Sequence, residues 1–105
     1  MPSVETLEKL IGTARDGALL RYSLGVEYAR AGDLPRALAQ LREAVQRDPV
    51  YSAAWKALGK TLEQSALPAQ ALEAYRSGIE AARRKGDRQA EKEMSVFARR
   101  LERRG

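Results

Sequence analysis

The sequence predicts an all-α fold, in which about five helices and a short N-terminal helix pack as an α-α superhelix. The helices would form a single domain over residues 1–105. Three observations support this prediction. Alanine and leucine dominate while aromatic residues make up 6% of the chain, which favours closely packed helices over a sheet. The chain also repeats internally, and helix-ending residues recur along it.

The internal repeat becomes visible when the sequence is shifted by 34 residues, which aligns Leu24-Gly25 with Leu58-Gly59. A glycine inside a helix costs on the order of 1 kcal/mol relative to alanine. Gly25 and Gly59 therefore indicate that the backbone of a partner helix comes too close for a side chain. The facing small residues would be Ala37, Ala44, Ala71 and Gly78. The large residues between the helices would be Leu24, Tyr28, Leu41, Leu58, Leu62 and Tyr75, and Trp55 is also expected in the core.

Turn-forming residues predict where the helices begin and end. Gly32-Asp33-Leu34-Pro35 would close one helix and cap the next, and Ser65-Ala66-Leu67-Pro68 repeats this turn without its glycine. Asp48-Pro49 would end the second helix, and Lys85-Gly86-Asp87 would separate the last two. The expected helices lie at about 18–31, 34–47, 51–65, 68–84 and 87–103, after a short helix at about 4–14 that Ser3 would cap.

These residues resemble the tetratricopeptide repeat, whose signature is W-x2-L-G-x2-Y, then A-x3-F, then P. The first copy, 18–51, has Arg21 at the tryptophan position, and the second, 52–85, has Arg83 at the proline position. The matching residues are Leu24, Gly25, Tyr28, Ala37, Leu41, Ala44 and Pro49 in the first copy, and Trp55, Leu58, Gly59, Leu62, Ala71, Tyr75 and Gly78 in the second. The resemblance is to small bacterial two-repeat proteins, with capping helices at 3–15 and 86–105.

The resemblance implies that the first helix of each pair lines a concave surface that binds a peptide or a helix of a partner protein. Tyr22 and Val26 would offer an apolar seat beside Lys56 and Lys60, which would attract a carboxylate. The chaperone-binding clamp of this family is not expected, because the chain contains no asparagine. The predicted concave residues are Leu19, Tyr22, Ser23, Val26 and Arg30 from the first copy, and Ala53, Lys56, Ala57, Lys60, Glu63 and Gln64 from the second.

The positive charge suggests nucleic-acid binding as an alternative function. The net charge of +5 arises within residues 83–105, since the preceding residues carry equal numbers of acidic and basic side chains. An apolar stripe of Ala90, Met94, Phe97 and Leu101 would face the core, with Arg99, Arg100, Arg103 and Arg104 pointing largely away from it. These arginines would contact phosphates. A solvated capping face is the preferred interpretation, because no exposed aromatic platform is evident.

The residue types that are missing argue against an enzyme. Cysteine and histidine are both absent, which excludes disulfides, Cys/His zinc sites and imidazole catalysis. No glycine-rich phosphate loop is present. The sequence predicts no catalytic residue, cofactor or metal. It also predicts a cytoplasmic protein without a signal peptide or membrane span, either a monomer or a weak homodimer.

Overall fold

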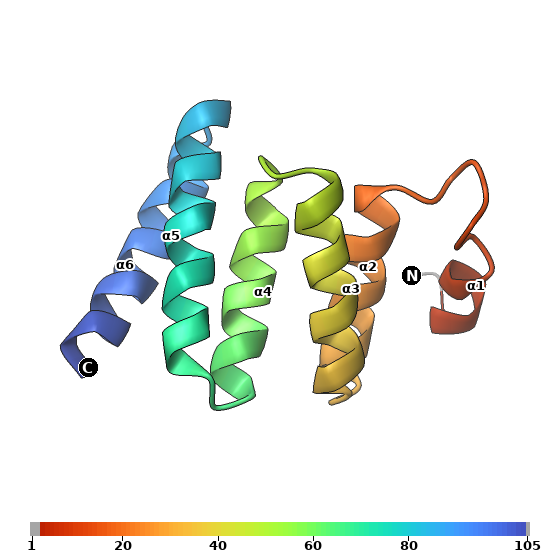
Figure 1. Cartoon of the computed structure of the whole chain (residues 1–105), viewed down its shortest axis with the longest axis horizontal. Helices are drawn as coiled ribbons and strands as arrows, with labels where there is room; N and C mark the ends of the chain where they lie inside the picture. The colour runs from red at the N-terminus through yellow and green to blue at the C-terminus, as the bar shows by residue number, and fades with distance from the viewer. Residues whose placement is uncertain (1–2, 105) are drawn as a thin grey trace.

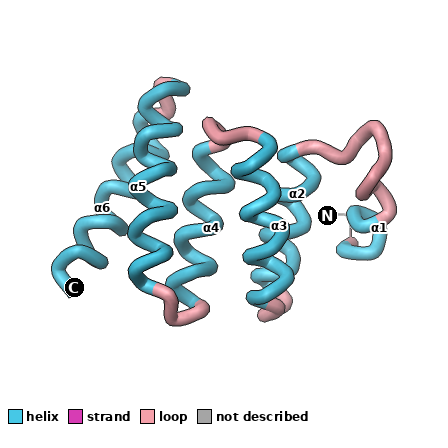
Figure 2. Tube along the Cα trace, in the orientation of Figure 1, coloured by secondary structure: helices cyan, strands magenta, loops and turns pink. Residues whose placement is uncertain are grey.

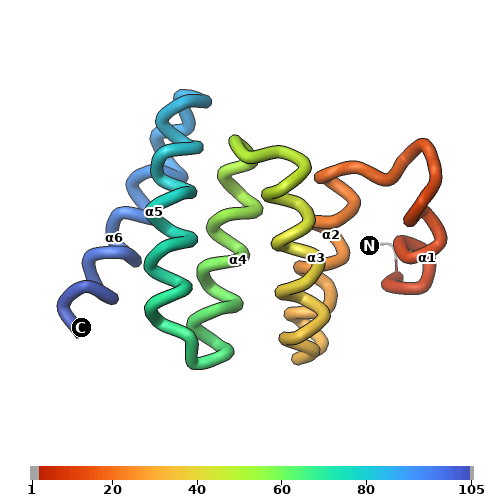
Figure 3. The backbone as a smooth tube through the Cα atoms, viewed as in Figure 1, coloured from red at the N-terminus to blue at the C-terminus, as the bar shows by residue number. Residues whose placement is uncertain are grey.

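The computed structural model describes residues 3–104, and within that range every regular element is an α-helix. Helices α2 to α6 stand side by side, and the loops between them alternate between two edges of the row (Figure 1, Figure 2). Helices α1 and α6 lie at opposite ends of the row (Figure 3). The predicted all-α superhelix is therefore confirmed. The six helices are α1 (Val4–Glu8), α2 (Ala18–Arg30), α3 (Leu34–Arg47), α4 (Ser52–Gln64), α5 (Pro68–Lys85) and α6 (Arg88–Arg104).

The first helix is shorter than predicted. Ser3 caps it as expected, since its side chain accepts a hydrogen bond from the backbone N–H of Thr6. The helix nevertheless ends at Glu8, where residues 4–14 had been expected to be helical. Gly12 adopts a φ of 81°, and the Thr13 hydroxyl donates to the carbonyl of Leu10. These turns break the helical hydrogen-bond ladder, because the left-handed residue redirects the chain.

In each helix pair one turn connects the two helices, and the two turns are equivalent. Gly32 adopts a φ of 81° between α2 and α3, and Ala66 adopts a φ of 60° between α4 and α5. The second turn thus keeps the left-handed conformation without the glycine that normally favours it. Asp33 then caps α3 by accepting a hydrogen bond from the backbone N–H of Arg36. The two turns have the same shape but different conformational cost.

At three helical glycines, a large side chain of the following helix fills the space that a Cβ would occupy. A Cβ on Gly25 would lie 2.5 Å from the Leu41 Cγ, and a Cβ on Gly59 would overlap the ring of Tyr75. A Cβ on Gly78 would likewise overlap Met94. The expectation that a partner backbone excludes a side chain was therefore wrong, because the neighbouring side chain fills this space. Leu41, Tyr75 and Met94 are fully buried as a result, so the glycines set the spacing of the row.

The N-terminal end of the row is closed by the chain itself. Leu7 of α1 is buried in a cluster with Leu20, Leu24 and Tyr28 of α2. The loop that follows α1 is held by Asp16. Its Oδ1 accepts from Arg21 Nε at 2.8 Å, and its Oδ2 accepts from the Gly12 backbone N–H at 2.9 Å.

The environment of Asp16 favours its charged form. Hydrogen bonds from Arg21 and from the Gly12 backbone hold the pKa of Asp16 well below its ordinary value. The side chain of Asp16 is only 8% exposed, and Arg47 adds a second ion pair at 3.4 Å. The loop is therefore fixed to α2 and α3 by charge, in addition to the apolar contact of α1.

Candidate protein-binding surface

The first helices of the two pairs lie next to each other and form one layer with the last helix. Helix α4 contacts both α2 and α6. Helices α3 and α5 lie in front of α2 and α6 in the view of Figure 1. The helical period turns the apolar face of α2 and α4 toward α3 and α5. The opposite face of these helices therefore stays available for a partner.

A groove lies between α2 and α4 on this surface. Its sides come from α2 and α4, and Leu41 of α3 reaches its base. The groove combines small and apolar side chains with the ends of one arginine, one lysine and one glutamine, which is the composition of a typical polypeptide-binding groove. It is lined by Val26, Ala29, Arg30, Leu41, Ala57, Lys60, Thr61 and Gln64. Five of the predicted concave residues are among them, namely Val26, Arg30, Ala57, Lys60 and Gln64.

Other predicted concave residues surround the groove without lining it. The ring of Tyr22 packs against the ring of Tyr51 with centroids 5.1 Å apart, so Tyr22 is held by the segment before α4. Leu19 is 68% exposed at the start of α2. Ser23 and Ala53 are half-buried. Together they extend the surface from the groove toward the N-terminal ends of α2 and α4.

Two predicted charged residues are already engaged within the protein. The ammonium group of Lys56 pairs with Glu93 of α6 at 3.0 Å. The carboxylate of Glu63 accepts a hydrogen bond from the hydroxyl of Tyr75. Burial, together with this contact, raises the pKa of Tyr75. Lys56 and Lys60 therefore do not present two equivalent free cations to a ligand.

The structure adds Phe97 and Arg100 of α6, which were not among the predicted concave residues, to this surface. The Lys60 ammonium lies 5.2 Å from the centre of the Phe97 ring, and the Arg100 guanidinium lies 5.8 Å from it. The Phe97 ring also packs against Tyr75, with centroids 5.4 Å apart. The expectation that Arg100 points away from the apolar stripe is corrected, because its side chain covers Phe97. All four arginines of this prediction are exposed, namely Arg99, Arg100, Arg103 and Arg104.

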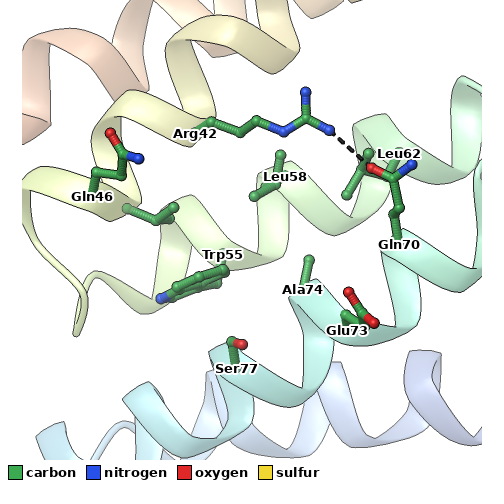
Figure 4. Close-up of a pocket in the computed structure, with 10 residues that line it drawn as sticks. Arg42, Gln46, Trp55, Leu58, Leu62, Gln70, Glu73, Ala74 and Ser77 are labelled. Atoms are coloured by element: carbon green, nitrogen blue, oxygen red, sulfur yellow. Dashed lines mark hydrogen bonds between the residues drawn. The ribbon is translucent and has the colours of Figure 1, made fainter.

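A second groove lies on the opposite side of the row. Figure 4 shows Arg42 and Gln46 of α3 facing Gln70, Glu73 and Ser77 of α5, with α4 between them. A hydrogen bond of 3.0 Å from Arg42 to Gln70 crosses it. The apolar side chains that line this groove are Val45, Trp55, Leu58, Leu62 and Ala74.

Trp55 lies at the end of this second groove. It was expected in the core but is only half-buried. Its ring packs against the core cluster, while its indole N–H donates to the carbonyl of Pro49 at 2.8 Å. A buried indole N–H needs a hydrogen-bond partner. For Trp55 this partner, the Pro49 carbonyl, lies at the edge of the core, where the ring is half-buried.

Residues 3–104 offer no arrangement that indicates metal chemistry. No three Asp or Glu side chains among them are grouped so that they would hold a metal ion. Among the same residues, no helix is both long and apolar enough to cross a membrane. The surfaces described above are suited to binding, through shape and a few charges.

Comparison with known proteins agrees with this architecture. Residues 18–61 match the tetratricopeptide repeat model. A TPR repeat-containing protein of Pseudomonas aeruginosa is 47% identical over 100 residues, which cover 95% of each chain.

Solved structures give the same result. A solution structure of a protein from Bordetella parapertussis has a TM-score of 0.82 and 44% identity, covering 99% of this chain and 90% of that one. A tetratricopeptide repeat domain protein from Salinibacter ruber has a TM-score of 0.78 and 31% identity, covering 83% and 88%. Tetratricopeptide repeats generally mediate protein–protein interactions and are generally non-enzymatic. With this sequence identity over nearly its whole length, the chain belongs to the tetratricopeptide repeat family.

Proposed function

We propose that this protein binds a peptide or helical segment of a partner protein in the groove between α2 and α4, without catalysing a reaction. The observation that carries this proposal is the groove itself. Val26, Ala29 and Ala57 leave space for apolar side chains of a ligand, and Arg30, Lys60 and Gln64 offer donors along its length. Apolar contact would supply most of the affinity, and the donors would fix the orientation of the ligand.

An acidic group of the partner would meet Lys60 and Arg100 in preference to Lys56. Both Lys60 and Arg100 lie over Phe97, and neither has a carboxylate within 4 Å among residues 3–104. The charge of Lys56 is already balanced by Glu93. The nucleic-acid alternative receives no comparable support, because Phe97, the aromatic residue of α6, packs against Tyr75. The predicted cytoplasmic location remains a prediction from the sequence.

The proposal is tested with two matched double variants of the tagged protein in extracts of its native cell. Ala57→Gln/Lys60→Glu fills the groove and reverses its charge. Ala39→Gln/Arg42→Glu makes the same changes on the exposed outer surface of α3. We expect the first variant to lose the captured partners and the second to keep them. Circular dichroism at matched temperatures verifies that both variants fold.

The captured partner is then purified and its affinity for each variant is measured by calorimetry. We expect the groove variant to bind at least about tenfold more weakly, which corresponds to about 1.4 kcal/mol. Equal affinity of the wild type and the groove variant would exclude the groove. Loss of binding with only the α3 variant would place the partner on the outer groove of Figure 4.

A further inference from the structure

Within residues 3–104 no further helix covers the C-terminal end of the row, whereas α1 covers the N-terminal end. Helix α6 lies beside α5 at the end of the row (Figure 3), and the flank that packs against α5 also touches α4. Its buried residues Ala90, Met94, Ala98 and Leu101 lie on that flank. No element within residues 3–104 covers the opposite flank. In a longer solenoid this is the position at which another helix would stack.

The open flank carries a regular pattern of side chains, here called the basic stripe: Arg88, Lys92, Val96, Arg99 and Arg103. Successive members are three or four residues apart, so they share one face of the helix. The stripe extends over roughly 22 Å at 1.5 Å per residue. Val96 is 47% exposed at its centre, in a shallow depression that Ser95 and Glu91 also line.

The cations of the basic stripe are not balanced by the protein itself. Among residues 3–104, Arg88, Lys92, Arg99 and Arg103 have no carboxylate within 4 Å. The three glutamates of α6 each pair with a cation outside the stripe. Glu91 pairs with Arg83 at 2.8 Å, Glu93 with Lys56 at 3.0 Å, and Glu102 with Arg76 at 2.9 Å. The stripe therefore combines an apolar centre with unbalanced positive charge toward both of its ends.

We propose that this stripe docks an acidic amphipathic helix of a partner protein, as an additional layer on the end of the solenoid. A small apolar face of that helix would cover Val96 and Ser95. Carboxylates on both sides of this face would pair with Arg88 and Lys92 at one end and with Arg99 and Arg103 at the other. This second surface is independent of the groove between α2 and α4.

The chemistry of the stripe favours this partner over two others. A second copy packed through the same stripe would place arginine against arginine, which repels. A nucleic acid would benefit from an exposed aromatic ring for stacking, and Phe97 is packed against Tyr75 on the other side of α6. An acidic helix satisfies both the charges and the exposed valine.

The experiment uses the full-length protein and a synthetic helical peptide of about 18 residues, long enough to span the stripe at 1.5 Å per residue. The peptide carries leucine along one face with glutamates on both sides. A second peptide replaces the glutamates with glutamines, and a third has the same composition in an order without an apolar face. Binding is followed by NMR chemical shifts and by fluorescence anisotropy at two salt concentrations.

We expect the acidic amphipathic peptide to shift the resonances of α6 and to bind more weakly as salt rises. Lys92→Glu/Arg99→Glu should weaken binding about tenfold or more, since each reversal turns an attraction into a repulsion. Val96→Ser keeps the charge and should weaken binding about threefold through lost apolar contact. The matched control Lys9→Glu/Arg15→Glu makes the same charge change at the other end of the row and should alter the affinity less than about twofold.

Several results would overturn the proposal. One is equal binding of the glutamine peptide or of the peptide without an apolar face. Another is an equal loss of affinity in the control variant, which would indicate a response to net charge alone. Tighter binding of single-stranded RNA than of the peptide would assign the stripe to nucleic acid. A dimer in sedimentation equilibrium that Val96→Ser dissociates would assign it to a second copy. Shifts confined to α2 and α4 would assign the peptide to the groove.

Discussion

The two helix pairs, α2–α3 and α4–α5, use different side chains at equivalent positions. In the first pair Arg21 holds the chain before its helix by pairing with Asp16, five residues earlier. In the second pair Trp55 occupies the same repeat position and donates to the carbonyl of Pro49, six residues earlier. The first helix is thus connected to the segment before it by an ion pair in one helix pair and by an indole hydrogen bond in the other.

The packing between the helices shows the same relationship. Gly25 accommodates Leu41 in the first pair, and Gly59 accommodates Tyr75 in the second. The side chain of Leu41 can relieve a clash by changing rotamer, whereas the ring of Tyr75 is rigid. The Tyr75 hydroxyl also donates a hydrogen bond to Glu63. The spacing of the helices depends on a glycine and a large residue together, and the choice of large residue sets how tolerant the pair is. Three predictions test this comparison.

The largest single loss of stability is expected for Gly59→Ala, which is compared with Gly25→Ala. The added Cβ overlaps the Tyr75 ring in the first variant and the Leu41 side chain in the second. After the gain in helix propensity, we expect a loss of about 2 kcal/mol in the free energy of unfolding for Gly59→Ala and about 1 kcal/mol for Gly25→Ala. Urea unfolding of the two variants measures this. Equal losses would mean that the ring moves as readily as the leucine.

Smaller effects on the free energy of unfolding are expected at the two equivalent turns, and the two substitutions should act in opposite directions. Gly32→Ala places a side chain at a φ of 81° and should lower the free energy of unfolding by about 1 kcal/mol. Ala66→Gly relieves the strain at a φ of 60° but frees the unfolded chain, so we expect a gain of about 0.5 kcal/mol. Thermal and urea unfolding test both. No space is restricted around Gly32, so a shift of the same sign in both variants would contradict the conformational argument.

The third prediction concerns Asp16→Asn, which keeps the size of the side chain and removes its charge, so that its effect depends on pH. The pKa of Asp16 is lower in the folded protein than in the unfolded chain, mainly through its hydrogen bond from Arg21. Its contribution is therefore fully present above the unfolded pKa of about 3.9 and is lost as the pH falls toward the folded pKa.

Wild type should consequently lose stability more steeply than Asp16→Asn below about pH 4. Urea unfolding between neutral and acidic pH provides the measurement. Asp87, whose pKa is also lowered by hydrogen bonds from the Ala90 backbone and Ser52, remains in both proteins and so serves as an internal control. Parallel pH profiles for the two proteins would show that Asp16 does not link the loop to the fold through its charge.

Much of the helical framework was predictable, because its signals are local. The ends of α2 to α6 each lie within one residue of the expected positions. The expected small residues Ala37, Ala44 and Ala71 are fully buried. The prediction of a longer α1 was wrong for a reason that is also local. An apolar residue pattern suggested that the helix continues, but turns at Gly12 and Thr13 break it.

The candidate surface was predicted only in part, because its charges depend on helices far apart in the sequence. Lys56 and Glu93 are separated by 37 residues, and helical periodicity does not indicate which faces of α4 and α6 meet. For the same reason Arg100 was expected to point away from the stripe that contains Phe97. The pairing of Lys56 and the position of Lys60 and Arg100 over Phe97 followed only from the packing of α6.

The positions of the helices and the alternation of small and large residues between them follow from local signals, since helix caps and apolar periodicity act over a few residues. Only the packing of the helices showed that the glycines face side chains and that Leu7 and Asp16 close the N-terminal end. It also decided which cations remain available for a partner. A charged side chain is paired or free according to which helices lie beside it. The packed core determines which helices these are and how far apart they lie.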